Sequence, residues 1–155
     1  MLRILFIPLF FFSVLPVAAV DFSGRWSGTG QVTTVSPFVG NKTYPCSKIE
    51  IHIEHRPEQV TVGKYNAVCE FVGGSDWGPY NFEIRGEKVF EDGEETGTLI
   101  GDTMKTLQAS GGVQYAFNLR LKEVVSGQEP ILESYYGTRN MMGTIVIEGN
   151  LTSSK

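Results

Sequence analysis

Strict alternation of apolar and polar residues between Val113 and Lys122 is the feature that most constrains this chain. Its apolar positions are Val113, Tyr115, Phe117, Leu119 and Leu121. A period of two places successive side chains on opposite faces of a β-strand, whereas one face of a helix repeats every 3.6 residues. From residue 20 onward we find no helical period longer than two turns. The sequence therefore predicts an all-β fold.

Shorter runs of the same kind recur between turns that contain glycine or proline. The expected strands cover residues 24–34, 46–55, 60–69, 80–85, 89–90, 97–107, 113–121, 131–136 and 144–151. Gly101 is expected to bend one of them, because an isolated glycine in a strand often marks a bulge. Short connections predict an antiparallel up-and-down meander, and about eight such strands would close into a barrel, which removes unpaired edges. A β-sandwich is the alternative.

The two cysteines, Cys46 and Cys69, are expected to form one structural disulfide. If the segments around them pair as a hairpin with its turn at residues 56–59, the register places the two cysteines opposite each other. Pro57 stands where a type I turn prefers proline. An even number of cysteines favours a bridge in an oxidising compartment, and such a bridge contributes about 2–4 kcal/mol.

The first 19 residues are typical of a signal peptide. Arg3 precedes an apolar run over residues 4–17, and Val17-Ala18-Ala19 offers small residues for cleavage. The run is shorter than the ~20 residues of a membrane-spanning helix and contains prolines. We therefore expect export to the periplasm or the exterior, no membrane insertion after cleavage, and a single domain over residues 20–155.

The net charge of the chain limits the classes of molecule that it is expected to bind. The chain has 13 basic and 17 acidic side chains and a net charge of −4. Nucleic acid and anionic membrane surfaces both select positive charge, so neither is expected as a partner. A small apolar molecule or another extracytoplasmic protein remains.

The residues Gly24, Trp26, Gly28 and Gly30 form a Gly-x-Trp-x-Gly-x-Gly pattern. Over these seven positions the chain resembles the first strand of lipocalin-like barrels. The resemblance implies that the Trp26 indole plugs the closed end of a barrel. It also implies a basic side chain late in the chain that packs across the indole, for which Arg120 and Arg139 are the candidates. Apart from the resemblance, the surrounding glycines favour a structural role for Trp26. A large ring among glycines fills space where the backbone coils.

The same pattern is similar to the start of the nitrobindin group of haem barrels. Those proteins hold haem through a histidine near the C-terminus. The histidines here are His52 and His55, and Tyr135 or Met141 would be unusual substitutes. No cofactor is therefore expected.

Patterns for catalysis or metal binding are weak, and the chain is not expected to be an enzyme. Residues 50–54 alternate Glu, Ile, His, Ile and Glu, which indicates a solvated outer face more than a metal site. His55 is expected to titrate in water. The acidic segment 91–95 is expected to be a turn that serves solubility, with weak calcium binding as the alternative. Asn41 and Asn150 lie in glycosylation sequons, which matter only in a eukaryotic secretory pathway.

Two functions remain as hypotheses. The first is a barrel that binds a small apolar molecule, and its interior would be lined by Phe82, Tyr115, Phe117, Leu119, Ile145 and Ile147. An internal void above roughly 300 Å³ would favour it. The second is an interaction protein, such as an inhibitor of a protease or lysozyme. It would act through the mature N-terminus or the predicted loop 73–80, where Trp77 and Tyr80 are contact candidates unless Trp77 folds back to cap the barrel. Residues 35–45 are a further predicted loop.

Overall fold

A computed structural model describes residues 20–38, 40–70, 73–122 and 128–154, and the secondary structure of these residues is entirely β. The strands are β1 (Gly24–Ser36), β2 (Gly40–Arg56), β3 (Gln59–Cys69), β4 (Gly73–Trp77), β5 (Tyr80–Arg85), β6 (Lys88–Glu91), β7 (Glu94–Ile100), β8 (Thr103–Ser110), β9 (Val113–Lys122), β10 (Ile131–Asn140) and β11 (Gly143–Ser153). The predicted all-β class is confirmed. The expected signal peptide lies outside the described residues.

All eleven strands belong to one antiparallel sheet, which closes into a ring. Its order is β2-β1-β11-β10-β9-β8-β7-β6-β5-β3, and β3 pairs with β2 to complete the circuit. One edge of β3 pairs with two strands: β5 pairs with residues 59–62 and β4 with residues 65–69. The cis peptide Gly78-Pro79 separates β4 from β5. The other edge of β4 is unpaired among the described strands.

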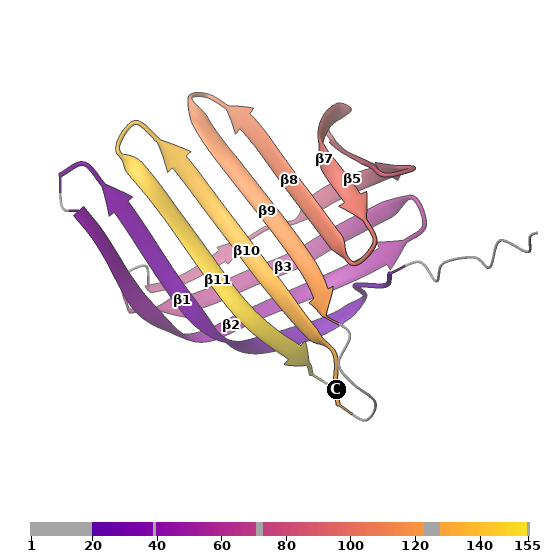
Figure 1. The fold of residues 1–155 in the computed structure, drawn as a ribbon, viewed down its shortest axis with the longest axis horizontal. Helices are drawn as coiled ribbons and strands as arrows, with labels where there is room; N and C mark the ends of the chain where they lie inside the picture. The colour runs from indigo at the N-terminus through magenta and orange to yellow at the C-terminus, as the bar shows by residue number, and fades with distance from the viewer. Residues whose placement is uncertain (1–19, 39, 71–72, 123–127, 155) are drawn as a thin grey trace, which may run out of the picture.

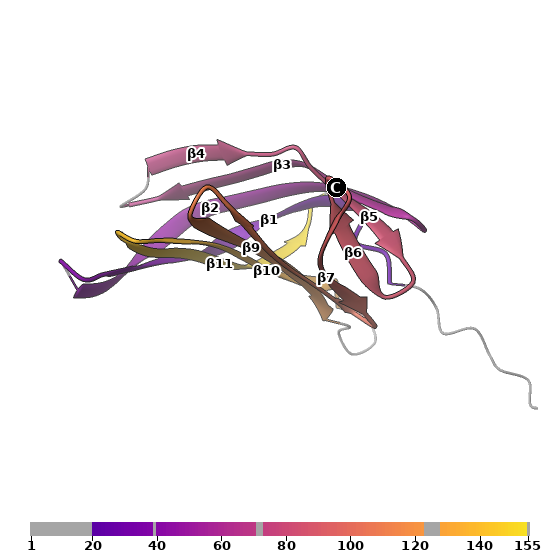
Figure 2. The ribbon, with the colours of Figure 1, turned by 90° about the horizontal axis from the view of Figure 1, so that it is seen from above.

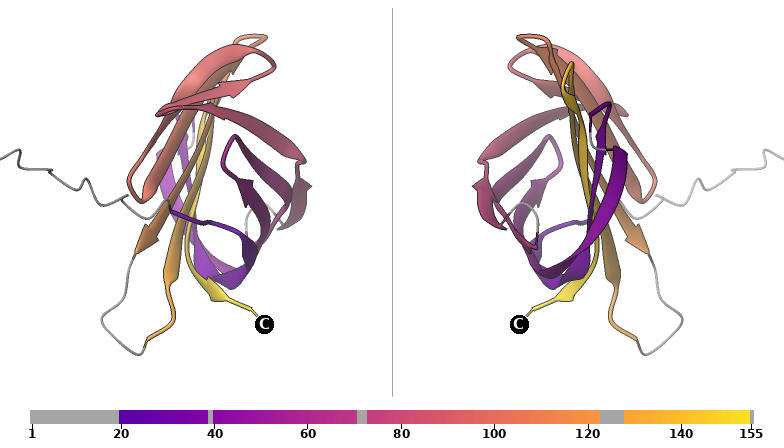
Figure 3. Two further views of the ribbon diagram at one scale, coloured as in Figure 1. Left: turned by 90° about the vertical axis from the view of Figure 1, so that its right-hand side faces the viewer. Right: turned by 90° about the vertical axis from the view of Figure 1, so that its left-hand side faces the viewer.

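The ring is flattened. In Figure 1, β1, β11, β10, β9 and β8 run side by side across the front, and β2 and β3 cross behind them. Seen from above in Figure 2, β2, β3 and β4 form one layer and β9, β10 and β11 another. The two side views of Figure 3 show how the sheet bends round to join these layers. The core lies between them.

The prediction of about eight strands was too low, for two physical reasons. Residues 97–107 form two strands rather than one bent strand, because Gly101 adopts a positive φ of 57° in the turn between β7 and β8. Residues 73–77 form β4 rather than part of a loop. The expected loop 35–45 and the expected acidic turn 91–95 are likewise shorter than predicted, since strands occupy most of both segments.

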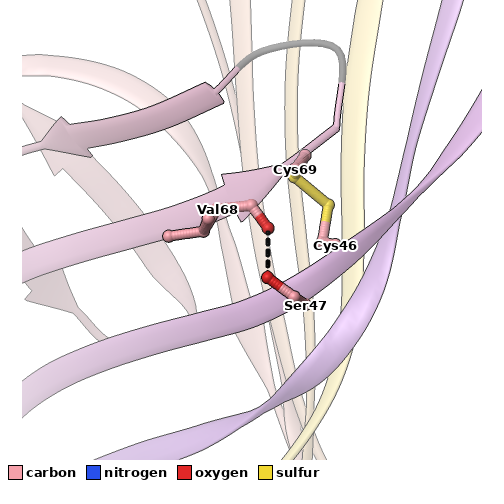
Figure 4. Close-up of a disulfide and its surroundings, with 4 residues drawn as sticks. All are labelled: Cys46, Ser47, Val68 and Cys69. Carbon is pink, nitrogen blue, oxygen red and sulfur yellow. Dashed lines mark hydrogen bonds between the residues drawn. A yellow bond between two sulfur atoms is a disulfide. The ribbon is translucent and has the colours of Figure 1, made fainter.

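The disulfide between Cys46 and Cys69 is confirmed, and Figure 4 shows it between β2 and β3. The predicted register holds from the turn to the pair Ile53–Val62, and Gly63 is then an extra residue on β3. The shift is reversed by Ser47, an extra residue on β2, whose hydroxyl donates to the Val68 carbonyl at 3.3 Å. Two compensating bulges therefore restore the alignment that brings the cysteines together.

Glycine on β1 allows its neighbours to approach closely. A Cβ on Gly30 would overlap the Glu148 carbonyl on β11 and would lie 2.6 Å from the Ile49 methyl on β2. The pairing of β1 with β2 also shifts by one residue between Gly28 and Gly30. Gly28 and Gly30 of the Gly-x-Trp-x-Gly-x-Gly pattern therefore occupy sites where a side chain does not fit.

Candidate functional site

One end of the ring is closed by the segment that leads into β1. Phe22 is fully buried, and its carbonyl accepts a hydrogen bond from the Trp26 indole at 2.9 Å. Buried aliphatic side chains from the surrounding strands complete the packing at this end. They are Ile51, Ile53, Val60, Ile84, Val89, Met104, Leu119, Leu132 and Leu151. We call this the closed end.

Neither arginine considered for Trp26 lies over the indole. Arg120 is on the outer face of β9, within 4 Å of the carboxylates of Asp102 and Glu133. Arg139 pairs with Thr144 and Gln114 at the opposite end of the ring. The Trp26 ring instead packs across Gly24, whose φ of 139° brings the backbone under the indole.

His55 belongs to the closed end, so the prediction that it titrates in water was wrong. Its ring stacks on Phe22 at 5.5 Å, and its Nδ1 accepts a hydrogen bond from the Phe22 amide at 3.3 Å. Its own amide donates to the Ser23 hydroxyl at 2.9 Å. Burial lowers the pKa of His55, and the nearby Asp21 opposes this only in part. The neutral imidazole thus fastens the segment before β1.

The other end carries a pocket, and we call it the open end. The turns between β1 and β2, β8 and β9, and β10 and β11 lie here (Figure 1). The pocket has a volume of about 160 Å³. Its lining comes from five strands, β5, β6, β8, β9 and β10: Tyr80, Phe82, Glu91, Thr106, Gln108, Tyr115, Ala116, Phe117 and Tyr136.

Aromatic rings form most of the pocket wall. Phe82 and Phe117 are nearly parallel with centroids 6.0 Å apart, and Tyr80 stacks against Phe117 at 5.9 Å. Tyr80 and Tyr136 lie beside each other, with ring centroids 6.4 Å apart. Burial raises the pKa of both tyrosines, so both are neutral around pH 7. Tyr115 completes the wall and remains more than one-third exposed.

Glu91 is the carboxylate in this pocket. It ends β6, two residues after the buried Val89, and therefore faces the interior. The type I′-like turn that follows it, Asp92-Gly93, has positive φ at both residues. Burial, and then the charge of Asp92, raise the pKa of Glu91. Sequence reasoning assigned Glu91 to a solvated turn, although its spacing from Val89 was a signal that it points inward.

Only part of the predicted interior lines the pocket. Phe82, Tyr115 and Phe117 do so. Leu119 and Ile147 are fully packed in the core, and Ile145 is 37% exposed beyond it. The two predicted loop contacts also lie on strands. Trp77 is half-buried in β4 and packs on Tyr65 and Tyr136 at 5.6 and 5.2 Å, so it caps the core, whereas Tyr80 lines the pocket.

A larger hollow lies on the outer face of β1 and β8–β11. It encloses about 850 Å³ but is an open depression with many charged and amide side chains, including Lys105, Arg120, Glu133 and Glu148. Arg120 is paired with Glu133, and Glu148 accepts a hydrogen bond from the Gln31 side chain. The hollow offers no apolar wall comparable to that of the pocket.

Two adjacent turns at the open end expose apolar side chains. Phe38 is 75% exposed, and Met141 and Met142 are 95% and 66% exposed. The turns lie side by side because Val35 pairs with Thr144 directly below them.

Within the described ranges, no three His, Cys, Asp or Glu side chains are grouped so that they could hold a metal ion. The same residues include no helix long and apolar enough to cross a membrane. No protein-family model matches the chain, and a search of curated proteins found no similar sequence.

Proposed function

We propose that this protein is an exported binding protein that holds one small, largely apolar molecule in the pocket at the open end of a lipocalin-like barrel. The observation that carries the proposal is the partial exposure of Tyr115 and Tyr80 beside the buried rings of Phe82 and Phe117. Apolar surface left accessible in a concave site is where small molecules bind.

The size of the pocket limits the ligand. Binding sites for drug-sized molecules usually enclose about 300–1,000 Å³. A cavity of about 150 Å³ in another protein holds one benzene molecule. The 160 Å³ here therefore suits a single ring or a group of similar size. The pocket is also smaller than the void of roughly 300 Å³ that was expected to favour a barrel that binds a small apolar molecule.

Titration with phenol and indole, followed by NMR, tests the proposal. Saturable shifts should centre on the amides of Thr106, Gln108 and Ala116, which line the pocket. Native mass spectrometry of the purified protein would show any small molecule that remains bound.

Tyr115→Ala removes one wall of the pocket and should weaken binding of either probe about tenfold. Leu107→Ala is the matched control, because Leu107 is exposed on the adjacent strand and lies outside the pocket lining. Absence of saturable binding by both probes, or equal effects of the two variants, would count against the proposal.

A second function, inhibition of an exported hydrolase such as a protease or lysozyme, is favoured by the exposed side chains of Phe38, Met141 and Met142. Aromatic residues and methionine are enriched in protein interfaces. The two turns that carry these side chains would insert into the active-site cleft of the hydrolase. Assays of lysozyme and serine proteases with the wild type and with Met141→Ser/Met142→Ser test it. Inhibition that this double variant loses would support the second function, and no inhibition by the wild type would reject it.

A further inference from the structure

Glu91 lies in the pocket without a positive charge to balance it. Among the described residues that line the pocket, none is lysine or arginine, and no ion pair involves Glu91. Its charged neighbour in the chain is Asp92, which repels it. Buried or half-buried charges in proteins are normally paired. A cation from outside the chain would supply the charge that Glu91 lacks.

The rest of the wall also suits a positive charge. Tyr80, Tyr115, Tyr136, Phe82 and Phe117 surround the pocket, and the faces of aromatic rings carry negative charge density. An ammonium group within about 6 Å of such a face is attracted to it, most strongly where water is excluded. The lining thus combines several aromatic rings with one carboxylate, and aromatic cages are known to recognise alkylated ammonium groups.

The pocket volume sets an upper limit on this cation. A space of 160 Å³ holds roughly as many heavy atoms as one benzene ring. A quaternary or tertiary ammonium head with methyl substituents is of this size. Its methyl groups present an apolar surface to the rings, while its charge faces the carboxylate.

We infer that the pocket takes a small organic cation of the alkylammonium class, with its charge paired to Glu91 and its methyl groups against the tyrosine and phenylalanine rings. The inference rests on the proposed function, because it names the class of ligand for the same pocket.

Choline and its uncharged carbon isostere, 3,3-dimethyl-1-butanol, provide the test, with phenol as a neutral ring probe. Isothermal titration of the purified protein should show choline binding about tenfold more tightly than the isostere. Glu91→Gln should reduce choline affinity to that of the isostere and leave the isostere and phenol unchanged. Glu94→Gln is the matched control, because Glu94 is exposed in the same hairpin and outside the pocket lining.

A measurement on the wild type does not depend on the folding of a variant. Choline affinity should fall as the pH decreases through the raised pKa of Glu91, while affinity for the isostere stays constant. The titratable groups around Glu91 are Asp92, Tyr80, Tyr115 and Tyr136. Asp92→Asn removes the neighbouring carboxyl group, so the pH dependence should persist with its midpoint moved to lower pH.

The outcomes distinguish the two proposals. If phenol binds but choline binds no better than the isostere, or if Glu91→Gln leaves choline affinity unchanged, the cation inference is overturned and the binding function stands. If none of the three probes binds, the binding function itself is overturned, and the inference with it.

Discussion

The two ends of the ring are built from different side chains. The closed end is filled by Phe22, Trp26 and aliphatic residues, and its polar atoms are hydrogen-bonded to one another. The open end has tyrosines, a carboxylate and a pocket. Because both ends belong to one sheet, long strands such as β9 and β10 pass from a packed half to a half that lines the pocket. Under the proposed function, stability and binding would lie at opposite ends of one sheet.

The largest test of this difference is Trp26→Ala. Loss of a large buried ring should lower the free energy of unfolding by about 3–5 kcal/mol. Tyr115→Ala, at the open end, should lower it by roughly 1 kcal/mol, because that ring is already partly in water. Urea titrations followed by circular dichroism measure both. Equal losses would show that the open end stabilises the fold as much as the closed end does.

The disulfide between Cys46 and Cys69 joins β2 to β3 covalently. Its 23-residue separation implies a stabilisation of about 3 kcal/mol, under the model in which the bridge restricts the unfolded chain. Thermal melts with and without reductant measure it, and Cys46→Ala/Cys69→Ala should match the reduced protein. A reduced protein as stable as the oxidised one would show that hydrogen bonding between β2 and β3 alone maintains this region.

Gly30 lies between the two ends, where β1 meets both of its neighbours. Gly30→Ala should cost about 1–3 kcal/mol, because the new methyl group would overlap β11 and Ile49. Gly63→Ala is the control, since Gly63 is also in a bulge but has open space around the position of a Cβ. Urea titrations of Gly30→Ala and Gly63→Ala measure the two losses in unfolding free energy. Their difference separates the effect of close strand approach from that of a bulge.

The smallest expected effect is a pH dependence at the closed end. The pKa of His55 is lower in the folded protein than its ordinary value near 6.5, so the unfolded chain binds more protons between those two values. The stabilisation is complete above pH 6.5 and is lost as the pH falls through the folded pKa. Melting temperatures between pH 5 and 8 should show this slope in the wild type and a smaller slope in His55→Asn. His52→Gln, on the outer face, should retain it.

The sequence was most informative where side chains alternate. Such alternation located β9 and placed Phe82, Tyr115 and Phe117 on the inner face, and the turn at Pro57 led to the disulfide. β4 escaped prediction because Gly73-Gly74-Ser75-Asp76 has almost no intrinsic strand preference and depends on β3 for its conformation.

Glu91 escaped prediction for a different reason. Four acidic residues in one segment indicate a solvated turn, and this composition outweighed the two-residue spacing from Val89 that places Glu91 on the inner face. The position of Arg139 was equally inaccessible, because its distance from Trp26 depends on the register of β10 in the closed ring.

The unpaired edge of β4 bears on how molecules of this protein meet one another. An open edge offers backbone groups on which a second chain can add a strand, which is a route to aggregation. β4 is only five residues long, contains two glycines and Asp76, and ends just before Pro79. Shortness, charge and proline are the features that make an edge a poor template. The place where the described ring is least complete is thus also a poor template for edge-to-edge association.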